Sequence, residues 1–129
     1  MPRLVRWLIR SALACLLAAL VLGVVRALWP GNAWLAGAWP VYLHLLVLGW
    51  LSQLVTGVAY WMFPRVERGA PATDWRGWMV FALLNSGLAV RVVTEPTMMR
   101  GPWLPLAALM QFLAMVFFAW SIWPRVRGR

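Results

Sequence analysis

Four long apolar runs, separated by short polar or proline- and glycine-containing segments, make up most of the chain. The runs cover about residues 11–29, 40–63, 78–94 and 104–123. Each approaches the roughly 20 residues that an α-helix needs to cross the hydrocarbon core of a bilayer. The pattern therefore predicts four transmembrane helices.

The connections between these runs are short. Trp29-Pro30-Gly31-Asn32 opens the first, residues 65–76 form the second, and Arg100-Gly101-Pro102 forms the third. Short connections oblige neighbouring helices to run in opposite directions. We expect residues 1–129 to form one domain, an all-α integral membrane protein built as a four-helix antiparallel transmembrane bundle.

The composition favours a membrane protein and argues against a nucleic-acid-binding protein. Hydrophobic residues make up 64% of the 129 residues and charged residues 12%, whereas a soluble domain is about half apolar and about a quarter charged. The net charge of +9 comes from arginines that lie mostly at the ends of the runs. Nucleic-acid binding needs a contiguous basic face, which this distribution does not provide. The expected partner is the lipid bilayer.

The distribution of arginines also predicts the orientation. The amino-terminal segment, the second connection and the carboxyl-terminal segment each hold three arginines, while the first connection holds none and the third holds only Arg100. Short loops rich in arginine stay on the cytoplasmic side of the membrane. We therefore expect both termini to be cytoplasmic in a cell inner membrane, and an even number of spans agrees in placing the two termini on one side.

The only histidine of the chain lies inside the second run. His44 follows the start of this run by about five residues, which places it roughly 7 Å below the outer end of the helix. Arg91 and Glu95 end the third run, and Arg26 ends the first, so all four are expected at the outer end of the bundle. An ionisable residue inside a membrane segment is a hypothesis of function by default.

Each of these residues also has a purely structural interpretation. Arg91 and Glu95 are four positions apart and can pair on one helix face, and Arg26 can extend to the membrane surface along its apolar stem. His44 can donate a hydrogen bond to a backbone carbonyl of a neighbouring helix.

Further polar residues lie deeper in the runs and are expected to make hydrogen bonds between helices. At 100° per residue, the face of the second helix that carries Gln53 also carries Gly49, Thr56 and Tyr60, and His44 points about 180° away from Gln53. The other deep polar residues are Asn85, Ser86 and Gln111.

The second run carries the pattern H-x₄-G-W-x₆-G-x₂-Y-x₃-P, formed by His44, Gly49, Trp50, Gly57, Tyr60 and Pro64. This pattern resembles the second transmembrane helix of subunit I in the haem–copper oxidase superfamily, chiefly its nitric-oxide-reductase and cbb3-type branches. In that family a histidine near the outer end of this helix is an axial ligand of low-spin haem b, and arginines near the outer surface hold the haem propionates. The resemblance implies that His44 ligates haem iron and that Arg91 or Arg26 binds a propionate.

The resemblance covers only the second run, and the rest of the chain departs from the family. Catalytic subunits of the family have around twelve helices and further histidines for a second haem and for copper or iron. One histidine cannot build a binuclear oxygen- or NO-reducing centre, so we do not expect this chain to be catalytic alone.

Two hypotheses of function follow. In the first, the chain is a small haem–copper-oxidase-like membrane subunit that binds b-type haem through His44 and serves electron transport in a respiratory chain. In the second, it is a cofactor-free accessory or assembly subunit; a small transporter or sensor is a further alternative. Low-spin haem needs a second axial ligand, for which Met98 or Met99, another membrane subunit, or His44 of a second copy in a homodimer are the candidates.

Overall fold

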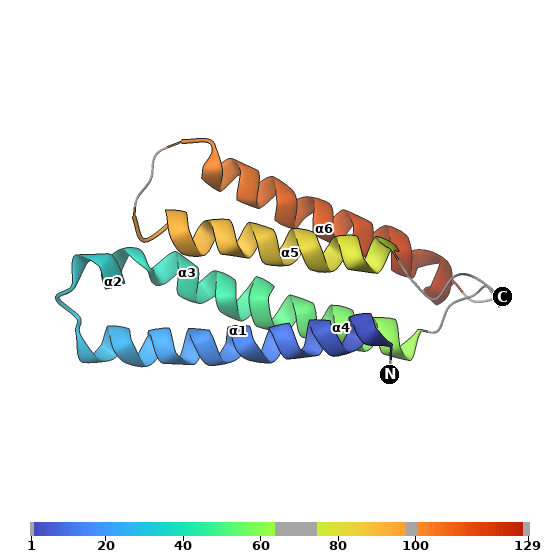
Figure 1. The fold of residues 1–129 in the computed structure, drawn as a ribbon, viewed down its shortest axis with the longest axis horizontal. Helices are drawn as coiled ribbons and strands as arrows, with labels where there is room; N and C mark the ends of the chain where they lie inside the picture. Colours follow the sequence, from blue (N-terminus) through green and yellow to red (C-terminus); the bar gives the residue numbers. More distant parts are fainter. Residues whose placement is uncertain (1, 64–74, 98–100, 128–129) are drawn as a thin grey trace.

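The computed structural model describes residues 2–63, 75–97 and 101–127, and the regular elements in these ranges are helices (Figure 1). In chain order they are α1 (Arg3–Leu28), α2 (Ala33–Gly37), α3 (Trp39–His44), the π-helix η1 (Leu45–Leu51), α4 (Ser52–Met62), α5 (Trp75–Thr94) and α6 (Trp103–Val126).

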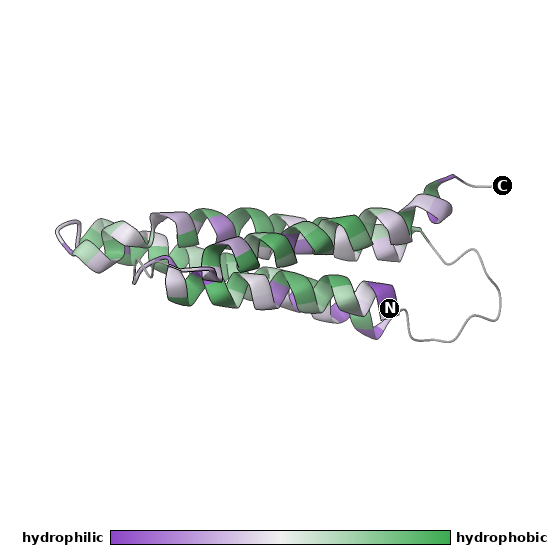
Figure 2. Cartoon of the chain, turned by 90° about the horizontal axis from the view of Figure 1, so that it is seen from above, coloured by the Kyte–Doolittle hydropathy of each residue, from purple (hydrophilic) through white to green (hydrophobic). Residues whose placement is uncertain are grey.

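Four helical segments are long and apolar enough to cross a membrane. They are α1, the continuous segment Trp39–Met62 formed by α3, η1 and α4, then α5, and α6. Figure 2 shows hydrophobic residues along the length of these helices and hydrophilic residues near the first turns of α1. The four segments indicate a multi-pass membrane protein, as the four apolar runs predicted.

The ends of three helices differ from the prediction. Helix α1 begins at Arg3 rather than near residue 11, and α5 begins at Trp75 rather than at residue 78. Arginine is a good helix former, so the basic residues that precede an apolar run continue the helix. Helix α6 extends past residue 123 and includes Pro124, which lies in its last turn, where a missing N–H removes only one backbone hydrogen bond.

The first connection contains a short helix that the sequence pattern did not predict. Asn32 begins α2 because its Oδ1 accepts hydrogen bonds from the backbone N–H groups of Trp34 at 2.9 Å and Leu35 at 3.2 Å. Asparagine is among the best residues for this capping role. Helix α3 follows with Pro40 in its first turn, where proline costs no hydrogen bond.

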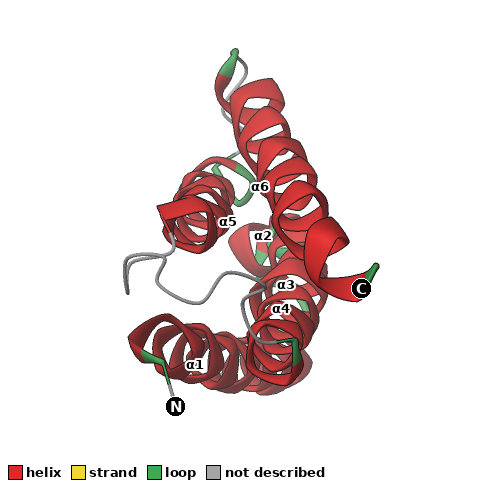
Figure 3. Ribbon diagram, turned by 90° about the vertical axis from the view of Figure 1, so that its right-hand side faces the viewer, coloured by secondary structure: helices red, strands yellow, loops and turns green. Residues whose placement is uncertain are grey.

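The helices form two closely packed pairs, α1 with the η1–α4 segment and α5 with α6 (Figures 1 and 3). Smaller contacts of α5 with η1 and of α6 with α4 join the pairs. Figure 1 shows the last turns of α1 and α5 and the first turns of α3 and α6 at the end of the molecule that holds α2. We call this the α2 end, and we call the opposite end, where both chain termini lie, the terminal end.

Buried side chains form three clusters along the molecule. At the terminal end, Leu4, Val5 and Leu8 of α1 pack against Tyr60 of α4. Nearer the α2 end, Leu88 of α5 packs with Ala19 of α1, Val41 of α3 and Leu45 of η1. The third cluster lies between α5 and α6 and consists of Val80, Leu84 and Ala114.

Candidate functional site

A chain of polar contacts crosses three helices towards the α2 end. Arg91 of α5 donates from Nη1 to Oε1 of Glu95 at 2.6 Å and from Nε to Oε1 of Gln111 in α6 at 2.9 Å. On the other side, Oε1 of Glu95 lies 3.5 Å from Nδ1 of His44 in α3. We call His44, Arg91, Glu95 and Gln111 the polar cluster.

The side chain of Glu95 is buried and that of Arg91 is half-buried. Only 6% of the Glu95 side chain and 15% of the Arg91 side chain are exposed. Oε2 of Glu95 and Nε2 of Gln111 are buried without a hydrogen-bond partner among the described residues. The sequence placed Glu95 at a helix end, where a carboxylate is normally exposed. In the structure its side chain is buried and its closest charged neighbours are Arg91 and His44.

The hydrogen bond of His44 determines which of its ring nitrogens is free. Nδ1 lies 2.7 Å from the carbonyl oxygen of Pro40, one turn earlier in the same helix. A carbonyl oxygen only accepts hydrogen bonds, so Nδ1 carries the hydrogen in this contact, and in the neutral imidazole Nε2 is then the nitrogen with a lone pair. The expected backbone partner was on a neighbouring helix; the structure places it in the same helix, because residues four apart share a face.

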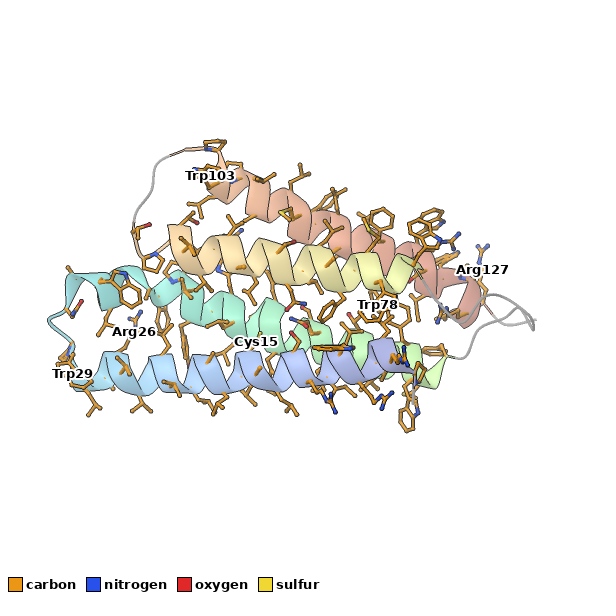
Figure 4. The ribbon with its side chains drawn as sticks, in the orientation of Figure 1. Cys15, Arg26, Trp29, Trp78, Trp103 and Arg127 are labelled. Carbon is orange, nitrogen blue, oxygen red and sulfur yellow. The ribbon has the colours of Figure 1, made fainter. Side chains whose placement is uncertain are left out.

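Arg26 lies apart from the polar cluster. Figure 4 shows it on the side of α1 that faces α2 and α3, where its guanidinium lies 4.8 Å from the ring centre of Trp39. Its Nη1 is buried and has no hydrogen-bond partner among the described residues. The structure thus brings His44, Arg91 and Glu95 into contact, and it places Arg26 against α3 without a hydrogen bond to any of the three.

The deeper polar residues form a second network between helices. Asn85 of α5 accepts a hydrogen bond from Ser11 Oγ of α1 at 2.7 Å and pairs with the side-chain amide of Gln53 in α4, with both N–O distances 3.3 Å. At the terminal end, the Tyr60 hydroxyl lies 2.5 Å from Ser121 Oγ of α6. The expected hydrogen bonds between helices are therefore confirmed for Gln53, Asn85 and Gln111.

Ser86 departs from that expectation, because its hydroxyl donates to Ala82 O and Leu83 O of its own helix. Ser11 and Ser121 are partners that the sequence reasoning missed. Ser11 stood at the edge of the first apolar run, and Ser121 lay near the end of the last one, where a single small hydroxyl gives little signal of a buried contact.

The possible haem ligands Met98 and Met99 and the loop residue Arg100 lie outside the described residues. Comparison of the chain with protein-family models, with curated proteins and with solved structures finds no match. The resemblance of the second helix to the haem–copper oxidases therefore stays a hypothesis that rests on its sequence pattern.

Proposed function

We propose that this chain is an antiparallel four-helix transmembrane bundle of a cell inner membrane, with both termini cytoplasmic and the α2 end facing outward. The support is the arrangement of charge. Of the arginines in the described ranges, Arg26 and Arg91 lie towards the α2 end, and the others belong to the terminal end. This distribution is the one that short loops of membrane proteins show.

Within this bundle we propose that His44 is an axial ligand of b-type haem. The hydrogen bond from Nδ1 to Pro40 O carries the proposal, because it leaves Nε2 with a free lone pair. Metal-ligating histidines almost always donate their other ring N–H to a carboxylate, a backbone carbonyl or water, which fixes the tautomer. The His44 side chain is 27% exposed, so its ring is not fully enclosed by the chain itself.

The two candidate arginines fit a haem propionate differently. Arg91 is already bound to a carboxylate and an amide oxygen, so it would have to exchange partners. Arg26 has a buried Nη1 without an acceptor among the described residues, and a guanidinium in this state gains most from an added carboxylate. Arg26 is therefore the better candidate of the two.

Bound haem would supply one-electron redox chemistry, which fits a subunit for electron transport in a respiratory complex. The chain's own contribution would be to hold one ring nitrogen unprotonated at a fixed orientation and to provide a cation at the same end of the bundle. The second axial ligand would come from another membrane subunit or from His44 of a second copy.

A cofactor-free accessory subunit is the second candidate, and the polar cluster itself favours it. His44, Glu95, Arg91 and Gln111 join α3, α5 and α6 in one chain of contacts. Such contacts hold helices together in lipid. In this function His44 contributes only through Nδ1.

Substitutions of His44 separate the two candidates. The side-chain amide of His44→Asn can donate to Pro40 O as Nδ1 does, but it offers no nitrogen to iron, whereas His44→Ala removes both functions. We expect wild-type protein to contain haem and both variants to lose it. When the haem-free proteins are compared, His44→Asn should keep the unfolding free energy of the wild type, because a bound ligand would itself stabilise the fold.

Haem content would be measured by extraction and stability by detergent titration. The cofactor-free subunit predicts no haem in any of the three proteins, with a loss of stability only in His44→Ala. Equal haem content in wild type and both variants would remove His44 from the proposed site.

A further inference from the structure

His44 and Gln53 both face α5, although their spacing in the sequence forbids this for an ordinary helix. Nine residues at 100° each amount to two and a half turns, so an α-helix would point the two side chains in opposite directions. In the structure His44 lies beside Glu95, the residue that directly follows α5, and Gln53 pairs with Asn85 of α5. The expected angle of about 180° between them is therefore wrong.

The π-helix between them accounts for the difference. In η1 the backbone hydrogen bonds span five residues instead of four, and the N–H of Ser52 donates to Val47 O. The Ser52 hydroxyl donates to the same carbonyl at 2.8 Å. One extra residue in a turn rotates the preceding part of the helix by about 100° relative to an α-helix. This rotation turns the His44 side chain towards α5.

Gly49 of η1 lies against both α1 and α5, with little space beside its Cα. A Cβ at this position would lie 2.8 Å from Cys15 Cβ and 2.9 Å from Cys15 Sγ of α1, and 3.0 Å from Leu88 Cδ2 of α5. Cys15 Cβ is fixed to the backbone of α1, so a side chain at residue 49 would force η1 to move or rotate.

We propose that the π-turn, made possible by glycine at position 49, is the device that directs His44 towards Glu95. Gly49 is thus a positioning residue for the polar cluster, about one and a half turns from the histidine that it directs. This role of Gly49 is the same whether or not the chain binds haem.

The single histidine makes the inference directly measurable. In protein labelled with ¹⁵N-histidine only His44 gives imidazole signals, and a carboxylate 3.5 Å from Nδ1 contributes to their chemical shifts. The effect of Glu95→Gln on these shifts, recorded in haem-free protein in lipid nanodiscs, therefore reports whether His44 faces Glu95. The change in chemical shift that Glu95→Gln causes would be compared in three backgrounds, namely the wild type, Gly49→Ala and Gly57→Ala.

Gly57→Ala is the matched control. Gly57 also packs against α1, and a Cβ at this position would lie 3.3 Å from Leu8 Cβ. Unlike Gly49, Gly57 lies in α4, the α-helical part of the segment. We expect Glu95→Gln to shift the His44 signals in the wild type and in Gly57→Ala, and to leave them unchanged in Gly49→Ala. A shift of the same size in all three backgrounds would overturn the proposal.

Deletion of Leu48 gives a second test that does not depend on Gly49→Ala folding well. Removing one residue from a π-turn yields an α-helix whose two halves keep their relative rotation. The deletion variant should therefore keep the effect of Glu95→Gln on His44. Loss of the effect would show that something other than the π-turn sets the direction of His44, and would also contradict the proposal.

Discussion

Replacing Arg91 by leucine tests whether the polar cluster is a buried ion pair. The guanidinium is the closest partner of Glu95, at 2.6 Å, and both side chains are largely enclosed. After the substitution the Glu95 carboxylate would keep only His44 Nδ1 near Oε1, at 3.5 Å, and Oε2 would still have no partner among the described residues. The charge would therefore be left nearly alone between helices.

Removing one partner of a buried ion pair costs about 3–5 kcal/mol. We expect Arg91→Leu to fall at the lower end of this range, because His44 can move closer to the carboxylate. A loss of about 3 kcal/mol lowers the folding equilibrium constant by roughly 150-fold. In Arg91→Leu/Glu95→Leu both charges are gone, and replacing a whole buried pair by apolar residues is often nearly neutral, so the double variant should recover most of the loss.

Titration of unfolding with a denaturing detergent measures these free energies. Arg76→Leu is the matched control, because the same change on the same helix removes a guanidinium that lies over the ring of Trp120, 4.3 Å from its centre; such a contact is worth about 0.5–1 kcal/mol. If Arg91→Leu cost no more than Arg76→Leu, or if the double variant were less stable than Arg91→Leu, the buried ion pair would be refuted.

Three further predictions concern the rest of the bundle. Asn85→Leu should cost about 2 kcal/mol, at roughly 0.6 kcal/mol for each of its three hydrogen bonds to other helices, whereas Ser86→Ala, whose hydroxyl bonds only within α5, should be nearly neutral in the same titration. Tyr60→Phe removes the contact with Ser121 Oγ and should cost about 1 kcal/mol, and an unchanged stability would contradict a contribution from this contact. A cysteine in place of Asn32 should react with a membrane-impermeant thiol reagent added to intact cells, while an enzyme fused after the carboxyl terminus should be active only in the cytoplasm.

The hydrophobic runs sufficed to predict the number of long helices and their approximate positions, because an apolar run of about 20 residues satisfies its own backbone hydrogen bonds in lipid as an α-helix. They did not predict where α1 begins. Arg3, Arg6 and Arg10 interrupt the apolar pattern without interrupting the helix, since their side chains lie on the exposed side of α1. Hydropathy reports which residues prefer lipid, and helix ends depend on backbone hydrogen bonds as well.

The site was predicted only in part, for a reason that lies in the π-turn. The depth of His44, Arg91 and Glu95 followed from counting residues along each helix, and it brought them to one end of the bundle. The Arg91–Glu95 pair followed from the spacing of four residues. The contact of His44 with Glu95 depends on rotation about the helix axis, which one extra residue in η1 changes by about 100°. No apolar or polar position in Leu45–Leu51 marks that extra residue, so this contact could not be predicted.

The absorbance spectrum of the purified protein, recorded oxidised and after reduction, tests the central claim most directly. If His44 ligates b-type haem, the wild-type protein should carry haem in a fixed ratio to chain and show the sharp α-band of a reduced b-type cytochrome, and His44→Asn should lack it. One haem per two chains would place His44 of two copies on one iron. A wild-type protein that shows no such band, even after incubation with haem and any partner subunits that co-purify with it, would contradict the haem proposal and leave the cofactor-free accessory subunit.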